Sequence, residues 1–260
     1  MKLFMPTRVI FEPSSLEYPL GKEIYEFFKN KNIDIISETS RNAARHIPGT
    51  TAAEKYANSK KTILITTNKN KKLDVCKPSA DYQFSLVSNC PGNCEYCYLQ
   101  TTQGTKPYIK VFVNIEDIFE VIKDHIKQDT DKPTTFEAAS LGDPLALEHI
   151  TGSLAKAIEF FSNLEKGNLR VVTKYNTVDS LLKLTHNEKT QFRISINSSY
   201  VIDTFEHNTS SLDERIEAVI KLANAGYPFG FLVAPIMQYE NWKQEYETLF
   251  QKLESQLGQS

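Results

Sequence analysis

Residues 84–102 read FSLVSNCPGNCEYCYLQTT, an apolar run followed by three cysteines within eight positions. The run is typical of a short strand, and Cys90, Cys94 and Cys97 follow it with the spacing C-x3-C-x2-C. The proline and glycine between the first two cysteines let the chain curl, so three thiolates can converge on one small group. Three thiolates leave one iron of a four-iron cluster open, and they are one short of a closed tetrahedral zinc site.

A regular alternation of strands and helices surrounds this loop. Short β-rich runs predict strands, and apolar residues at helical spacing between them predict helices. The predicted strands cover 84–87, 134–139, 169–173, 192–196 and 228–235, and the predicted helices cover 115–127, 145–163, 177–185, 212–225 and 241–256. This order favours a parallel sheet, open or curved toward a barrel, with its chemistry at the carboxyl ends of the strands. The chain stops after the fifth helix, which leaves a barrel incomplete.

A small α/β region is predicted before this alternation. Its expected elements are strands at 8–11, 33–36 and 62–67 and a helix over 15–29. The predicted fold class is therefore α/β, with an N-terminal region over 1–80 and a partial barrel over 81–260.

The composition excludes several classes of protein. The 260 residues are 40% hydrophobic and 24% charged, an ordinary globular composition, and the net charge of −2 gives no overall basic field for nucleic acid. No apolar run reaches the roughly 18 residues that span a bilayer, and the N-terminus lacks a signal-peptide core. Four cysteines are too few for a disulfide scaffold, so we expect the reducing cytoplasm, with thiols free to bind metal.

Two interpretations of the cysteines follow from their spacing. In one, Cys76 supplies a fourth thiolate and closes a structural zinc site, which would suit a nucleic-acid module. In the other, Cys90, Cys94 and Cys97 hold a cubane whose remaining iron binds a small molecule.

With Tyr96 directly before the last cysteine, the loop resembles the signature of radical S-adenosylmethionine (SAM) enzymes. The resemblance implies a [4Fe-4S] cluster whose open iron chelates the amino and carboxylate groups of SAM. It also implies one-electron cleavage of SAM to a 5′-deoxyadenosyl radical, and a partial (β/α)6 barrel. In such enzymes the cofactor carries the hard chemistry, and the protein positions it.

Polar and small residues at the predicted strand ends are candidates for SAM binding. Gly142 and Asp143 resemble the family's Gly-Gly-Glu-Pro element, whose backbone and acid hold the methionine amino group. Lys174 could reach a carboxylate, since it follows the third strand. The full set of cofactor candidates is Tyr96, Gly142, Asp143, Lys174, Ser195, Asn197 and Ala234, of which Ser195 and Asn197 could bond ribose or carboxylate and Ala234 could admit adenine. Each of these residues singly also has an ordinary structural interpretation.

Longer stretches resemble the spore photoproduct lyase family. The resemblance runs from the first residue to about residue 250 and includes EPSSLEYPLGKEIYE (12–26), KPSADYQF (77–84), CEYCYLQTT (94–102), RVVTKYNTVDSLL (170–182), FRISINSSYVI (192–202) and AGYPFGFLVAPI (225–236). It implies repair of the thymine dimer 5-thyminyl-5,6-dihydrothymine in UV-damaged DNA, begun by hydrogen removal from C6. The dimer must leave the duplex to reach the cluster. The implied partners are damaged DNA and an electron donor such as a flavodoxin or ferredoxin, in the spore core of a spore former.

One departure from the family concerns the last hydrogen donor. The family's donor is a cysteine at the end of the second strand, where this chain has Ser140. An O–H bond is much stronger than an S–H bond, so serine is a poor hydrogen-atom donor. This chain carries Cys76 where members commonly have serine. We hypothesise that Cys76 is the donor, with Tyr96 and Tyr98 as relay partners, which requires Cys76 to lie near both the cluster and Ser140. The alternative is a small buried residue.

A second departure concerns the end of the chain. The family continues past residue 260 with a further strand, a lesion-binding segment rich in Arg, Lys and Tyr, and a β-hairpin. We therefore expect a truncated chain or a degenerate relative as one alternative. A radical SAM enzyme with another substrate is the other.

Overall fold

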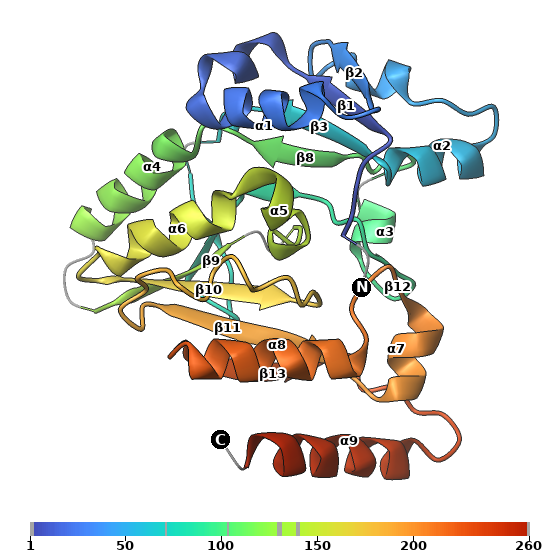
Figure 1. The fold of residues 1–260 in the computed structure, drawn as a ribbon, viewed down its shortest axis with the longest axis vertical. Helices are drawn as coiled ribbons and strands as arrows, with labels where there is room; N and C mark the ends of the chain where they lie inside the picture. Colours follow the sequence, from blue (N-terminus) through green and yellow to red (C-terminus); the bar gives the residue numbers. More distant parts are fainter. Residues whose placement is uncertain (1–2, 71, 103, 129–131, 139–140, 259–260) are drawn as a thin grey trace.

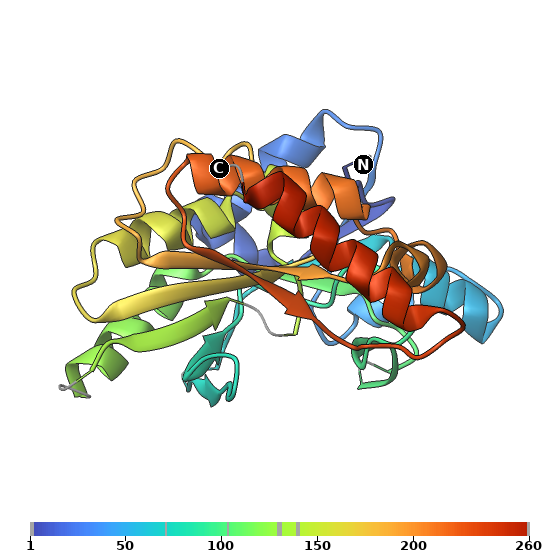
Figure 2. The ribbon, with the colours of Figure 1, turned by 90° about the horizontal axis from the view of Figure 1, so that it is seen from below.

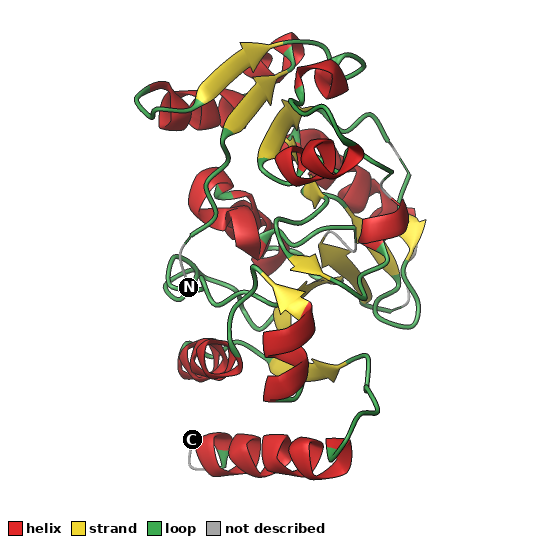
Figure 3. Ribbon diagram, turned by 90° about the vertical axis from the view of Figure 1, so that its right-hand side faces the viewer, coloured by secondary structure: helices red, strands yellow, loops and turns green. Residues whose placement is uncertain are grey.

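Two sheets organise the protein in the computed structural model, which describes residues 3–70, 72–102, 104–128, 132–138 and 141–258. A five-stranded sheet has the order β2-β1-β3-β8-β6, and a six-stranded sheet has the order β13-β11-β10-β9-β5-β4. Figure 1 shows the five-stranded sheet at one end of the molecule and α9 (Trp242–Leu257) at the other, and Figure 3 shows the same layering from the side. The predicted α/β class is confirmed.

The five-stranded sheet combines the N-terminal region with a later segment. Its strands are β1 (Arg8–Phe11), β2 (Asp34–Ser37), β3 (Thr62–Thr66), β6 (Val87–Ser88) and β8 (Ile109–Phe112), and its neighbouring helices are 3-10 helix η1 (Pro13–Glu17), α1 (Pro19–Lys29), 3-10 helix η2 (Ala43–His46), α2 (Ala52–Ser59) and α4 (Ile115–Gln128). β8, which the sequence analysis missed, pairs in parallel with β3. Since β6 and β8 come after residue 80, this sheet crosses the predicted boundary, and the division at 80 stays a prediction.

The six-stranded sheet carries the predicted barrel strands. They are β4 (Asp74–Val75), β5 (Tyr82–Phe84), β9 (Thr134–Ala138), β10 (Gly167–Thr173), β11 (Thr190–Ile196) and β13 (Phe229–Val233). All neighbours from β5 to β13 pair in parallel, and β4 is antiparallel at the edge. The carboxyl ends of five parallel strands therefore meet at one edge of the sheet.

The remaining elements cover or connect this sheet. They are β7 (Asn93–Cys94), α3 (Leu99–Thr102), 3-10 helix η3 (Leu145–Leu147), α5 (Glu148–Thr151), α6 (Ser153–Ser162), α7 (Ser199–Phe205), β12 (Glu206–His207) and α8 (Leu212–Asn224). Figure 2 shows α6 and α8 on one face of the six-stranded sheet. Alternate side chains of β10 and β11, such as Val171 and Phe192, are fully buried there.

Three predicted elements differ from the structure. The strand predicted over 84–87 is divided, because Phe84 ends β5 in one sheet while Val87 begins β6 in the other. The helix predicted over 145–163 is interrupted at Gly152, whose φ of 58° belongs to the left-handed region that ends a helix.

The helix predicted over 177–185 is absent, and successive turns replace it. Leu181 N donates to Val178 O, and Leu184 N donates to Leu181 O, at 2.8 and 3.1 Å. Val178 and Leu181 are fully buried. Repeated turns bury residues three apart just as a helix does, so the apolar spacing alone did not separate the two structures.

Candidate active site

The three cysteines of the loop line one cavity of about 480 Å³. The loop leaves β6 through Asn89, whose φ is 66°, and reaches α3 after residue 98. Cys94 lies in β7, which pairs with β12, and Cys97 N donates to Cys94 O at 3.1 Å. Gly92 N donates to Cys90 Sγ at 3.3 Å, and a Cβ on Gly92 would lie 3.0 Å from the Tyr175 hydroxyl. The glycine therefore lets the loop close against Tyr175.

The donor set fits a cluster better than a zinc ion. Cys76 is not among the residues that line the cavity of the other three cysteines, and its Sγ lies 3.7 Å from Glu137 Oε1. This arrangement disfavours a closed zinc site that uses all four cysteines. Three thiols on one cavity wall suit a cubane, because each thiolate then meets a different iron.

Burial controls the protonation of these thiols. It raises the pKa of Cys90 to about 12 and that of Cys94 to about 11. A buried thiol binds metal only as the thiolate, so a cluster would have to displace these protons. Lys60, at the end of α2, is one of the nearby cations: its Nζ donates to Cys90 O at 2.7 Å, and its charge acts on all three thiols. The sequence analysis did not identify it.

Most of the predicted SAM-binding residues lie on the same cavity. Cys90, Cys94 and Cys97 share its lining with Tyr96, Gly142, Asp143, Lys174, Ser195 and Ala234. Gly142 forms a parallel bridge with Asn89, and a Cβ there would come within 2.8 Å of Asn89 O. A glycine is therefore required where β9 approaches the cluster loop.

Asp143 is a buried carboxylate that joins the ends of two strands. It accepts hydrogen bonds from the Thr173 hydroxyl at 2.9 Å and from Lys174 N at 3.1 Å. Burial nevertheless dominates and raises the pKa of Asp143 to about 6. Asn197, in contrast, lies outside the cavity lining: its amide nitrogen donates to Pro235 O at 2.8 Å, and its oxygen accepts from Tyr246 at 2.6 Å. These bonds connect β11 to α9.

A buried ionic network contacts the cysteine loop at Tyr96 and at β7. Glu206 accepts from Lys174 Nζ at 2.8 Å, from Arg215 Nη2 at 2.6 Å and from the Tyr96 hydroxyl. Lys174 Nζ also donates to Tyr96 and to Ser195 Oγ, at 2.8 and 3.0 Å. Both Glu206 and Arg215 are fully buried as side chains, so the loop is held by charges that lack access to water.

The sequence analysis missed Glu206, Arg215 and Tyr175. Arg215 left one signal, because it replaces an apolar residue on the buried face of α8, next to Ile216 and in line with Leu212. Glu206 lies in β12, a short strand that the sequence analysis did not predict, and no sequence pattern indicated its role. Tyr175 lies 3.5 Å from Cys90 Sγ through its hydroxyl.

The proposed donor group is only partly described. Tyr98 lines the cavity with 53% of its surface exposed, and burial, followed by the charges of Cys97 and Cys76, raises the pKa of its hydroxyl. Cys76 is not among the residues that line this cavity. Ser140 falls outside the described residues, so its distance from Cys76 stays untested.

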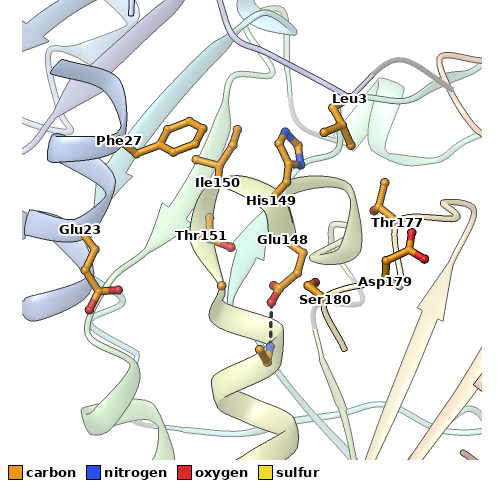
Figure 4. A pocket seen from close by; sticks show the side chains of 12 residues that line it. Leu3, Glu23, Phe27, Glu148, His149, Ile150, Thr151, Thr177, Asp179 and Ser180 are labelled. Carbon is orange, nitrogen blue, oxygen red and sulfur yellow. Dashed lines mark hydrogen bonds between the residues drawn. The ribbon is translucent and has the colours of Figure 1, made fainter. Parts of the chain in front are cut away.

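A second cavity lies away from the cysteines. It measures about 600 Å³ and is lined by residues of α1, α5 and the turns after β10 (Figure 4). Glu148 there accepts the backbone N–H groups of Leu154 and Ala155 at 2.8 and 2.9 Å, which caps the start of α6. The His149 Nε2 contacts Phe4 O at 2.7 Å. These contacts give Glu148 and the Nε2 atom of His149 structural roles in this cavity.

No helix in the described part of the chain is long and apolar enough to cross a bilayer.

Comparisons with known proteins identify one family over nearly the whole chain. The family model described as spore photoproduct lyase matches residues 4–260. Spore photoproduct lyase of Geobacillus sp. (strain Y412MC61) is 49% identical over 257 residues, 99% of this chain and 75% of that protein. Spore photoproduct lyase of Bacillus subtilis (strain 168) is 47% identical over 256 residues, covering 98% and 75%.

Solved structures match equally closely. A spore photoproduct lyase complexed with dinucleoside spore photoproduct is 50% identical and superposes with a TM-score of 0.95, over 98% of this chain and 75% of that one. A second structure, with the same identity, TM-score and coverage, holds AdoMet and dinucleoside spore photoproduct. It is a variant in which one cysteine is replaced by alanine and one serine by cysteine.

Proposed function

Because the chain belongs to the spore photoproduct lyase family, we propose that it reverts 5-thyminyl-5,6-dihydrothymine in UV-damaged DNA to two thymines by radical SAM chemistry. One observation carries this proposal: the three cysteines line the same cavity as Gly142 and Asp143 and the strand-end residues that follow them. When bound, the [4Fe-4S] cluster and SAM supply a 5′-deoxyadenosyl radical that takes a hydrogen from C6 of the lesion.

The residues of this chain then have defined tasks. Cys90, Cys94 and Cys97 hold the cluster. The Lys174 ammonium, which lines the cavity and donates to Glu206 at 2.8 Å, is the cation assigned to the SAM carboxylate. The missing side chain at Gly142 lets this residue approach Asn89 of the cysteine loop, which places the Gly142 backbone and Asp143 on the cavity that would hold the methionine amino group.

The function is tested by reconstituting the protein with iron and sulfide without oxygen, reducing it, and adding SAM with or without a dinucleotide lesion. We expect 5′-deoxyadenosine and thymine to form together only when the lesion is present. Formation of 5′-deoxyadenosine with no thymine recovered from the lesion would instead favour a radical SAM enzyme with another substrate.

The affinity for SAM should depend on pH through Asp143. Above its pKa of about 6 the carboxylate is ionised and favours the SAM ammonium; below that pH it is protonated, and the attraction is lost. The affinity should therefore fall by up to about tenfold per pH unit below 6, the limit for one linked proton. Titration calorimetry with the oxidised, cluster-loaded protein measures this dependence. Asp143→Asn is the control, since an amide does not titrate; the same slope in that variant would exclude Asp143.

We further propose Cys76 as the hydrogen donor to the thymine radical. Burial, followed by the neighbouring Glu137 carboxylate, raises the pKa of Cys76 to about 11. The group therefore keeps its S–H bond at neutral pH, as an atom donor must. Tyr96 and Tyr98 line the cavity together with Cys97, which supports a relay through these two tyrosines toward the cluster.

The remaining partners belong to the same proposal. The reaction needs one electron for the cluster, and we propose a small reduced flavodoxin or ferredoxin as its source. We propose the cytoplasm, or the spore core of a spore former, as its location, because thiols stay reduced there.

A further inference from the structure

Two arginines lie on the face of the six-stranded sheet opposite α6 and α8. Strand alternation directs Arg170 and Val172 of β10 to this face, together with Arg193 of β11. The register places Val172 beside Arg193, and Arg193 beside Gly230 of β13. Val172 lines the cysteine cavity, as does Ser195, two residues after Arg193. Arg193 therefore lies at the border of the active-site cavity.

The two arginines lie on neighbouring strands, with Arg193 two register positions beyond Gln191, the partner of Arg170. Burial, followed by the charge of Arg193, lowers the pKa of Arg170, while the charges of Glu137, Asp81 and Cys76 act in the opposite direction. Arg170 donates to the neutral Gln191 side chain at 2.8 Å. Its register partner Glu137 accepts from Ser79 and from Cys76. Arg193 is half-buried and makes no hydrogen bond or ion pair with any residue that the structure describes. A half-buried, unpaired cation next to another cation is costly unless an anion joins them.

The space beside Arg193 is open. A Cβ built on Gly230, its neighbour on β13, would meet no atom within 4 Å. Leu232, which lines the same cavity, is 36% exposed. A ligand that enters the cavity over β13 can therefore reach the Arg193 guanidinium without displacing another side chain of the described structure.

We propose that Arg193, supported by the charge of Arg170, binds the phosphodiester group that joins the two nucleosides of the lesion. This inference rests on the proposed function, which brings a dinucleotide into the cavity. A guanidinium offers a planar fork that matches phosphate oxygens in a bidentate way. A phosphate contact of this kind orients the nucleic acid and carries no base information. Such a contact would hold the thymine dimer at a fixed distance from the cluster.

Two lesion substrates that differ only in this phosphate test the proposal. The affinities of dinucleotide and dinucleoside spore photoproduct are measured by calorimetry with the oxidised, cluster-loaded protein, so that no turnover is needed. We expect the wild type to favour the dinucleotide by about tenfold to a hundredfold, the usual range for a charge-assisted contact. Arg193→Gln should lose this preference and keep its affinity for the dinucleoside.

Two further variants serve as controls. Arg8→Gln removes an arginine that pairs with Asp34 in the five-stranded sheet at 2.7 Å, and it should keep the full preference. Arg193→Lys retains a point charge and should keep part of the preference for the dinucleotide. This variant makes the test independent of whether the glutamine variant folds. Melting followed by circular dichroism identifies any variant that does not fold.

The proposal is overturned if Arg193→Gln weakens both substrates equally, because the arginine would then contact the thymine bases. It is also overturned if the wild type does not distinguish the two substrates. Failure of the proposed function would be seen separately, as a lack of lesion-dependent 5′-deoxyadenosine in reduced protein.

Discussion

Cys94→Ala should yield a protein that folds but holds no complete cluster and forms no 5′-deoxyadenosine. Two thiolates cannot retain a four-iron cubane in place of three, and the open iron would lose its defined position. The fold should survive, because Cys94 pairs with Glu206 through the backbone of β7 and β12, which alanine preserves. Loss of one small buried side chain costs only about 1 kcal/mol of unfolding free energy by this argument.

Iron and sulfide content, the visible absorbance of the reconstituted protein and the 5′-deoxyadenosine yield measure this result. Cys76→Ala is the matched control, since it removes a thiol outside the cavity lining. That variant should reconstitute to the same iron content as the wild type. A Cys94→Ala protein with full iron content and SAM cleavage would disprove the assignment of the loop as the cluster site.

The second large effect concerns Cys76→Ala. The variant should still form 5′-deoxyadenosine when the lesion is present, because the cluster and the SAM residues are unchanged. Thymine recovery should fall at least about tenfold, since no S–H group would remain to transfer its hydrogen atom to the thymine radical. In the wild type that transfer leaves a thiyl radical on Cys76. One electron from the proposed flavodoxin or ferredoxin, passed through the tyrosine relay, and one proton from water would restore the thiol.

Product analysis by liquid chromatography separates thymine from by-products of the trapped radical. Ser140→Cys added to the Cys76→Ala variant should restore thymine recovery, because it places a thiol where the family carries its donor. Product partitioning in the single variant Cys76→Ala that matches the wild type would reject Cys76 as the donor.

Local patterns predicted most of the residues that the structure brings together at this cavity. The C-x3-C-x2-C spacing needs no distant partner to bring thiols to one wall, since Cys94 and Cys97 are linked by a single turn. Parallel strands end at a common edge, so residues that follow them, such as Asp143, Lys174 and Ser195, meet there whatever the details of packing. Strand periodicity located β10, β11 and β13 to within a few residues.

Apolar periodicity did not predict secondary structure correctly where two backbone conformations bury residues at the same sequence spacing. The turns after β10 place Val178 and Leu181 in the core as a helix would. β8 was missed because a short half-buried strand between loops has a weak signal. The strand over 84–87 was divided between two sheets, a choice that depends on which neighbours are available and not on the four residues themselves.

What the sequence by itself determined is the set of groups at the strand ends and in the cysteine loop, because these depend on local spacing and on a general property of parallel sheets. Only the tertiary structure decided which charged residues contact the cysteine loop and hold it in place. Glu206, Arg215 and Lys60 reach the loop from segments that are 30 to 121 positions away from Cys94 and Cys90, as counted along the chain. The tertiary structure also places the Asn197 side chain outside the cavity lining, where it forms hydrogen bonds with Pro235 and Tyr246. Buried charges are tolerated only where opposite charges meet them, and that meeting is a property of the folded chain.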